Sequence, residues 1–177
     1  TDKIRMFSFF NAYNERNKVI DYLSKMVEIG NSFGVKMCHE NEKEVYGDTA
    51  DRVQELMDSV KGLKFIYDPA NFVQMDELAD KTLSMFHSKV EYFHIKDSLY
   101  AGAIVPPGKG EAKIKQMLDD YKINGKKRML PFVYKSTDNM MIQMLKQKEL
   151  PFSTDEGSIL IFNNETEKIL LDLAKKT

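Results

Sequence analysis

Short apolar runs alternate with amphipathic segments along most of this chain. Five of the runs are typical of strands because they are short, apolar and bounded by polar or turn-forming residues. They cover residues 4–10, 35–39, 63–67, 90–94 and 128–134. Pro131 lies inside the last run and weakens that assignment, because proline cannot donate a hydrogen bond to a neighbouring strand.

Apolar residues recur at helical spacing between these runs. The first such segment, residues 17–29, places Val19, Ile20, Leu23, Met26 and Val27 on one face. The second begins at Asp48 or Thr49 and ends at Gly62, and the third runs from about Asp76 to His87. The fourth carries Ile114, Met117, Leu118 and Tyr121 on one face. The fifth runs from Asn163 or Asn164 to Lys176. We therefore expect five helices, each following a strand-like run.

The alternation of strand and helix, with no hairpin signal, predicts one α/β domain with a parallel sheet over residues 1–177. Right-handed crossovers then place the carboxyl ends of all the strands on one side, where such folds carry their chemistry. A complete eight-stranded parallel barrel takes roughly 250 residues. About five βα units fit this chain, so the sequence predicts an incomplete (β/α) barrel of the TIM type.

Composition narrows the possible functions. The chain has 177 residues, 42% of them hydrophobic, and a net charge of −1, which gives no basic surface for a nucleic acid. No apolar run approaches the ~20 residues that a membrane-spanning helix needs. Cys38 is the single cysteine and cannot form an internal disulfide, so we expect a reducing, cytoplasmic setting.

Three potential metal ligands lie at the ends of predicted strands: Glu40, Asp68 and His94. Carboxylate oxygens suit Mg²⁺ and Mn²⁺, and imidazole suits Mn²⁺ and the later metals. Each acid taken alone is more simply a solvated loop residue, and Asp68-Pro69 alone is more simply a turn. Their matching positions in successive units favour a shared metal site, at which the cation would polarise a carbonyl or stabilise an enediolate.

Other polar residues follow the same strand ends. Strand alternation turns Lys96 to the same side as His94, and Asp97 can orient a ring or contact a substrate hydroxyl. Lys109 stands between two glycines before a helix, where backbone N–H groups favour an anion. His39 should point away from Glu40 and is interpreted as structural, and no chemical role is expected for His87.

Several stretches resemble the sugar phosphate isomerase/epimerase family, the xylose isomerase-like TIM barrels. They read IRMFSFF, CHENEKEVYGDTADR, YDPANFVQ, YFHIKDS and VPPGKGE, and they extend from about Ile4 to Tyr121 in the family's order and spacing. The resemblance covers the late strands of the barrel and implies that the first three strands are missing. It also implies that the chain is a late segment of a barrel.

The resemblance implies a divalent metal held by Glu, Asp, His and Glu, of which the first three correspond to Glu40, Asp68 and His94. Mn²⁺ or Mg²⁺ is the expected ion, with Zn²⁺ or Co²⁺ as alternatives. Such enzymes move a proton between neighbouring carbons of a sugar or sugar phosphate, and Glu40 would inherit a catalytic role. The residues expected to contact the substrate are Lys96, Asp97, Lys109 and Asn71.

The fourth ligand departs from the family pattern. A Glu is expected at the end of the last strand, where this chain reads RMLPFVYKS and has Val133 or Tyr134, with Asp138 nearby but displaced. A metal-dependent isomerase or epimerase is therefore the first hypothesis. The second is a catalytically impaired or inactive barrel fragment that acts as a binding or assembly module, and whose open sheet edge favours a homodimer or pairing with a missing barrel half.

A third hypothesis, an endonuclease of the same superfold with a zinc cluster, is disfavoured by the sequence. Such sites are rich in histidine, whereas this chain has three histidines in all. Asn71 stands where a DxxH ligand pair would need histidine, and the near-neutral charge does not suit a DNA substrate.

Overall fold

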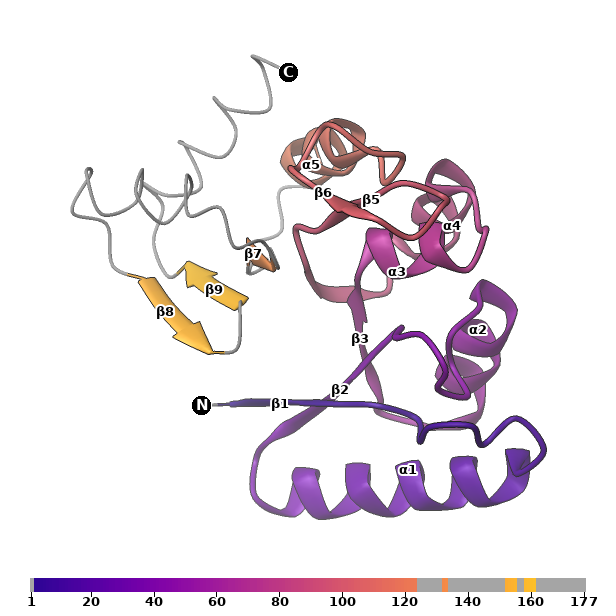
Figure 1. Ribbon diagram of the computed structural model, residues 1–177. Helices are drawn as coiled ribbons and strands as arrows, with labels where there is room; N and C mark the ends of the chain where they lie inside the picture. The colour runs from indigo at the N-terminus through magenta and orange to yellow at the C-terminus, as the bar shows by residue number, and fades with distance from the viewer. Residues whose placement is uncertain (1, 124–131, 134–151, 156–157, 162–177) are drawn as a thin grey trace.

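A four-stranded parallel sheet organises the first part of the molecule (Figure 1). The computed structural model describes residues 2–123, 132–133, 152–155 and 158–161. The sheet has the order β1-β2-β3-β4, with the strands Lys3–Met6, Lys36–Glu40, Lys64–Tyr67 and Val90–Phe93. All three pairings are parallel, as the sequence predicts, so the carboxyl ends of the four strands lie at one edge.

Helices follow the strands and bury one face of this sheet. Their bounds are α1 Arg16–Ser32, α2 Ala50–Ser59, α3 Pro69–Gln74, α4 Ala79–Phe86 and α5 Ile114–Ile123. Aromatic side chains of β3 and β4 pack against the helices, and the rings of Phe65 and Phe86 lie 5.0 Å apart between centroids. Met6 and Met37 on β1 and β2 pack in a second cluster with α1 and α2. Burial of these side chains is the main force that holds the helices on the sheet.

The strand register separates this helix-covered face from the opposite one. Met6 lies beside His39, and His39 lies beside Phe65, so these residues share the helix-covered face. Arg5 lies beside Cys38, and Glu40 lies beside Ile66, on the other face. The second face therefore corresponds to the interior of a barrel and contains a small buried cluster of Cys38, Ile66 and Tyr92.

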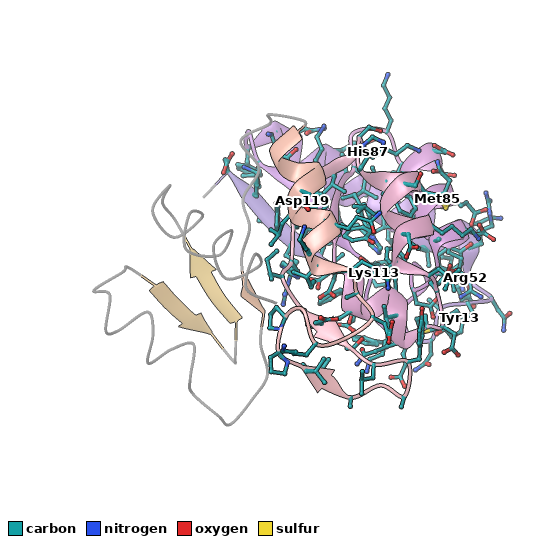
Figure 2. All side chains as sticks on the ribbon, turned by 90° about the horizontal axis from the view of Figure 1, so that it is seen from above. Tyr13, Arg52, Met85, His87, Lys113 and Asp119 are labelled. Atoms are coloured by element: carbon teal, nitrogen blue, oxygen red, sulfur yellow. The ribbon has the colours of Figure 1, made fainter. Side chains whose placement is uncertain are left out.

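The loop between β1 and α1 is fastened to the start of α2. The Tyr13 hydroxyl donates to Asp48 over 2.7 Å, and Arg52 donates to the same carboxylate, also over 2.7 Å. The Arg52 guanidinium lies over the Tyr13 ring, 4.7 Å from its centroid, and Figure 2 shows the two side chains together at the surface. These contacts hold the segment that follows β1 at the edge where the strands end.

The third predicted helix differs from the structure. The segment from Asp76 to His87 is helical only over α4, and a separate helix, α3, begins at Pro69. Taken alone, Asp68-Pro69 is predicted to form a turn. Asp68 instead caps α3, because its side chain accepts from the backbone N–H of Asn71 over 3.1 Å and proline fits the first helical position.

The expectation of no hairpins is wrong. β5 (Asp97–Ser98) pairs antiparallel with β6 (Ile104–Val105) inside the predicted loop. β7 (Phe132–Val133) and β8 (Phe152–Asp155) both pair antiparallel with β9 (Ser158–Ile161). The fifth predicted strand is therefore present at Phe132–Val133 but belongs to an antiparallel sheet, while Asp138 and the last predicted helix lie outside the described residues.

The parallel sheet with helices on one face is an incomplete barrel of the TIM type, as the sequence predicts. Among the described residues, none of the helices is both long enough and apolar enough to span a lipid bilayer. The prediction of one domain over residues 1–177 stays a prediction.

Candidate metal centre

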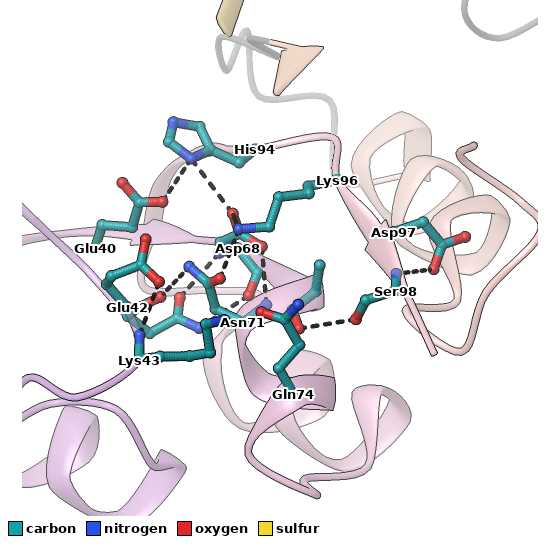
Figure 3. Close-up of polar contacts among 12 residues, drawn as sticks. Glu40, Glu42, Lys43, Asp68, Asn71, Gln74, His94, Lys96, Asp97 and Ser98 are labelled. Carbon is teal, nitrogen blue, oxygen red and sulfur yellow. Dashed lines mark hydrogen bonds and ion pairs between the residues drawn. The ribbon is translucent and has the colours of Figure 1, made fainter. Parts of the chain in front are cut away.

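Glu40, Asp68 and His94 converge at the carboxyl edge of the parallel sheet (Figure 3). Glu40 is the last residue of β2, Asp68 follows β3, and His94 follows β4. One potential ligand atom from each lies within 4.8 Å of the other two. Because the three strands are parallel neighbours, their ends bring the three side chains together without any long loop.

Two buried carboxylate oxygens at this edge make no hydrogen bond. Glu40 Oε2 and Asp68 Oδ2 make no hydrogen bond in the structure, although both atoms are buried. A cationic side chain approaches each of them: Arg5 Nη1 lies 3.3 Å from Glu40 Oε2, and Lys96 Nζ lies 3.1 Å from Asp68 Oδ2. Two carboxylate oxygens without hydrogen bonds and a nearby imidazole make a donor set that fits a divalent cation.

The His94 ring connects the two carboxylates. Its Nδ1 lies 2.8 Å from Glu40 Oε1 and 3.7 Å from Asp68 Oδ2. Burial lowers the pKa of His94, but the charges of Glu40 and Asp68 and the hydrogen bond with Glu40 outweigh burial and raise it to about 9. A proton on His94 therefore stabilises the two acids in the metal-free protein, and a metal ion must displace that proton to bind the ring.

Lys96 and Asp68 form a second buried charge pair. Burial alone would raise the pKa of Asp68, but Lys96 and His94 outweigh it and lower that pKa below its usual value. Burial would likewise lower the pKa of Lys96, and Asp68 outweighs it and raises that pKa. Lys96 therefore stays protonated, and it also donates to Asn71 Oδ1 over 2.6 Å.

Asn41 fixes the backbone at Asp68, a role that the sequence reading missed. Its Oδ1 accepts from the Asp68 N–H and its Nδ2 donates to the Asp68 carbonyl, both over 2.9 Å. Asn71 Nδ2 in turn donates to the Asn41 carbonyl over 2.7 Å. The signal in the sequence is an asparagine directly after Glu40, at the end of one strand and beside the end of the next.

The predicted substrate contacts have different surroundings. Lys96 lies at the centre, whereas Asn71 is buried with both ends of its amide bonded, so its contact with a substrate stays a prediction. Figure 3 shows Asp97 farther along the chain, past Lys96 and beside Ser98. Lys109 is exposed in the loop after β6. The predicted roles of Asp97 and Lys109 are likewise untested.

The Asp97 carboxylate has partners other than the ring or hydroxyl that the sequence suggested. It accepts from four backbone N–H groups, those of Ser98, Gly108, Gly110 and Ala112, over 2.8 to 3.0 Å. Asp97 therefore anchors the loop that carries Lys109. Gly110 approaches it so closely that a side chain at position 110 would collide with the carboxylate.

His39 lies on the helix-covered face, away from the metal ligands, in agreement with its predicted structural role. The Ser8 hydroxyl accepts from the Gly47 N–H over 2.7 Å and lies 2.9 Å from His39 Nε2. Burial lowers the pKa of His39 to about 3, so the ring is neutral. It contributes to the core and not to the candidate metal centre.

Comparisons with known proteins identify the fold family of the chain. Residues 9–126 match a family model described as a xylose isomerase-like TIM barrel. No match is found among curated proteins. Similar solved structures include a probable 3-DHS dehydratase from Bacillus anthracis (16% identity, TM-score 0.67), the zinc-bound IOLI protein (20%, 0.63) and L-ribulose 3-epimerase (15%, 0.58).

These solved structures are longer than the chain. The matches cover 84, 84 and 90% of this chain and 62, 61 and 55% of the dehydratase, the IOLI protein and the epimerase, respectively. At such low identity the similarity establishes the fold and not the activity. The chain spans roughly three fifths of the length of these proteins, and the activity of a whole relative is therefore not transferred with the fold.

Proposed function

Because this chain belongs to the xylose isomerase-like TIM barrel family, we propose that Glu40, Asp68 and His94 bind a divalent cation for isomerase or epimerase chemistry. The substrate would be a sugar or a sugar phosphate, and the reaction a proton transfer between adjacent carbons. The observation that carries the proposal is the pair of buried carboxylate oxygens without hydrogen bonds beside the His94 ring. Mn²⁺ or Mg²⁺ is the preferred ion, with Zn²⁺ and Co²⁺ as alternatives.

A bound divalent cation would supply Lewis-acid polarisation of the substrate carbonyl, which makes the neighbouring C–H group acidic. The Glu40 carboxylate would be the base that takes this proton and returns it to the former carbonyl carbon, while the proton of the adjacent hydroxyl passes to the former carbonyl oxygen. Lys96 cannot serve as that base, because its ammonium stays protonated beside Asp68. It instead donates a hydrogen bond to a substrate oxygen, while Asn71 holds its ammonium in place.

A binding module without turnover is the second candidate. It is favoured by the sequence RMLPFVYKS, in which Val133 or Tyr134 replaces the fourth ligand expected from the family. Within the described residues, the candidate centre contains Glu40, Asp68 and His94 and no fourth His, Cys, Asp or Glu. Such a protein would bind the metal and its ligand but would lack the second proton-transfer group.

Calorimetric titration of Mn²⁺ tests the proposed centre. Wild type should bind one ion, and His94→Ala should bind it at least ~10-fold more weakly, since a ligand is lost. His87→Ala is the matched control because His87 follows α4 and is not one of the three clustered residues. Affinity should also rise about tenfold per pH unit between pH 6 and 8, because binding displaces the His94 proton.

Equal Mn²⁺ affinity in wild type and His94→Ala, or no binding in either, would contradict the proposed centre. Proton transfer is then measured separately, as deuterium incorporation at the carbon next to the carbonyl of a ketose in D₂O. Incorporation that depends on Mn²⁺ and on Glu40 supports the enzyme. Mn²⁺ binding without incorporation over a panel of ketoses and their phosphates supports the binding module.

A further inference from the structure

Arg5 brings a solvent-accessible positive charge to the candidate metal centre. It lies on β1 beside Cys38 of β2, on the same face as Glu40, and its Nη1 is 3.3 Å from Glu40 Oε2. The side chains of the three potential ligands are at most 4% exposed, whereas that of Arg5 is 45% exposed. Arg5 is therefore a charged group that a molecule from solution can contact beside the centre.

The charges of the centre do not balance after a divalent cation binds. Glu40 and Asp68 offset the two charges of the ion, and Glu42 attracts Lys96 electrostatically. In the described part of the chain, the acid next to Arg5 is Glu40. A bound cation would offset the negative charge of Glu40. The Arg5 guanidinium would then be available to pair with an anionic group of the substrate.

The neighbouring ring holds this guanidinium in position. Arg5 Cζ lies over the Phe7 ring, 5.3 Å from its centroid, in the geometry of a cation–π contact. Phe7 in turn contacts Phe10, with 6.4 Å between the ring centroids. An arginine stacked in this way keeps the edge of its planar fork free, and that edge matches the two oxygens of a carboxylate or a phosphate.

We propose that the centre selects an anionic substrate, a hydroxy-carbonyl compound that bears a carboxylate or a phosphate, and that Arg5 binds this anionic group. The inference rests on the proposed function, since it requires a cation on Glu40. It goes further because it distinguishes a charged substrate from a neutral sugar. Arg5 is then a residue that determines specificity, and metal binding releases it from Glu40 for the substrate.

The test measures ligand binding to the Mn²⁺-loaded protein by calorimetry. The neutral probe is dihydroxyacetone. The two anionic probes contain the same hydroxy-ketone group: dihydroxyacetone phosphate also carries a phosphate, and hydroxypyruvate a carboxylate. At least one anionic probe should bind ~10- to 100-fold more tightly than the neutral one, the range expected for a charge-assisted hydrogen bond. Comparison of the two anionic arms shows which group the site prefers.

Variants assign the preference to Arg5. Arg5→Gln should abolish the preference for the anionic probes without weakening the binding of dihydroxyacetone. Arg5→Lys should retain part of that preference because the positive charge remains. Arg16→Gln is the matched control, since Arg16 pairs with Glu55 between α1 and α2 and not with Glu40. Mn²⁺ affinity of Arg5→Gln should equal or exceed that of wild type, because a competitor for Glu40 is removed.

The outcomes separate this inference from the proposed function. Failure of wild type to bind Mn²⁺ overturns both. Normal Mn²⁺ binding with equal affinity for neutral and anionic probes overturns the role of Arg5 alone. A preference that survives in Arg5→Gln also overturns it, because the anion would then be bound by the metal or by Lys96.

Discussion

His39 and His94 are both buried, yet their surroundings give them opposite charge states. Around His39 the only effect is burial, which lowers its pKa to about 3 and keeps the ring neutral. Burial acts on His94 as well, but Glu40 and Asp68 outweigh it and raise its pKa to about 9. The difference comes from two carboxylates on one face of the sheet and a serine hydroxyl on the other.

The two histidines should therefore affect stability in different pH ranges. The folded pKa of His39 is below its unfolded value of 6.5, so its neutral state stabilises the fold above pH 6.5, and this contribution is lost as the pH falls towards 3. The folded pKa of His94 is raised, so its contribution is complete below pH 6.5 and is lost as the pH rises through about 9.

Urea unfolding between pH 7.5 and 5.5 tests the sign for His39. Wild type should lose roughly 1 kcal/mol of unfolding free energy relative to His39→Gln between pH 6.5 and 5.5. Glutamine keeps a polar atom near the Ser8 hydroxyl and does not titrate. A His39→Gln slope equal to that of wild type would contradict the prediction.

Individual site residues differ in how far they could be predicted. Glu40, Asp68 and His94 each lie at or directly after the end of a strand. Because the ends of neighbouring parallel strands lie side by side, the strand pattern of the sequence was enough to predict that these residues are close together. Arg5 lies within β1, and its contact with Glu40 depends on a register that pairs Arg5 with Cys38. A single sequence carries no signal for that register, and the role of Asn41 depends on the same kind of pairing.

At the scale of elements, the segment after β4 is organised around one buried acid. Asp97 accepts four backbone hydrogen bonds, two of them from Gly108 and Gly110 on either side of Lys109. Backbone donors in a glycine-rich loop have few other partners, so the carboxylate takes the place of a regular strand or helix. This acid therefore determines the path of the loop from β6 to α5.

Asp97→Asn should destabilise the protein by about 2–4 kcal/mol, because an amide nitrogen would face backbone N–H groups that now have a carboxylate acceptor. Urea unfolding measures the loss, and hydrogen exchange should become faster at Gly108 and Gly110. Asp58→Asn is the control, since Asp58 is exposed and pairs with Gln54 and Lys89 at the surface. A loss below about 0.5 kcal/mol would contradict the anchoring role.

The elements that the sequence did not predict have one feature in common, which is that no repeated apolar pattern marks them. Apolar periodicity identified β1 to β4 and α1, α2 and α5, because those elements bury one repeated face. The helix α3 depends on its cap at Asp68 and on Pro69, and these residues also begin turns. The two-residue strands β5 and β6 are too short for any period, and their pairing follows from contacts with Asp97 that lie far along the chain.

At the scale of the whole molecule, β1 and β4 are the outer strands of the described parallel sheet. β1 pairs only with β2 and β4 only with β3 among the strands described. A closed barrel would pair every strand on both sides, and the solved relatives are longer than this chain. An outer strand of a sheet can pair with a strand of another chain through its backbone.

For this 177-residue chain expressed alone, we expect a homodimer that forms across β1, and native mass spectrometry at several protein concentrations measures it. Ile4→Lys places a charge on β1 at a side chain that is 46% exposed, and it should shift the population to monomer because lysine on an edge strand opposes pairing. Ile29→Lys is the matched control, since Ile29 is 61% exposed on α1 and away from the sheet edge. A wild-type monomer at all concentrations, or a dimer lost only in Ile29→Lys, would show that β1 is not the pairing edge.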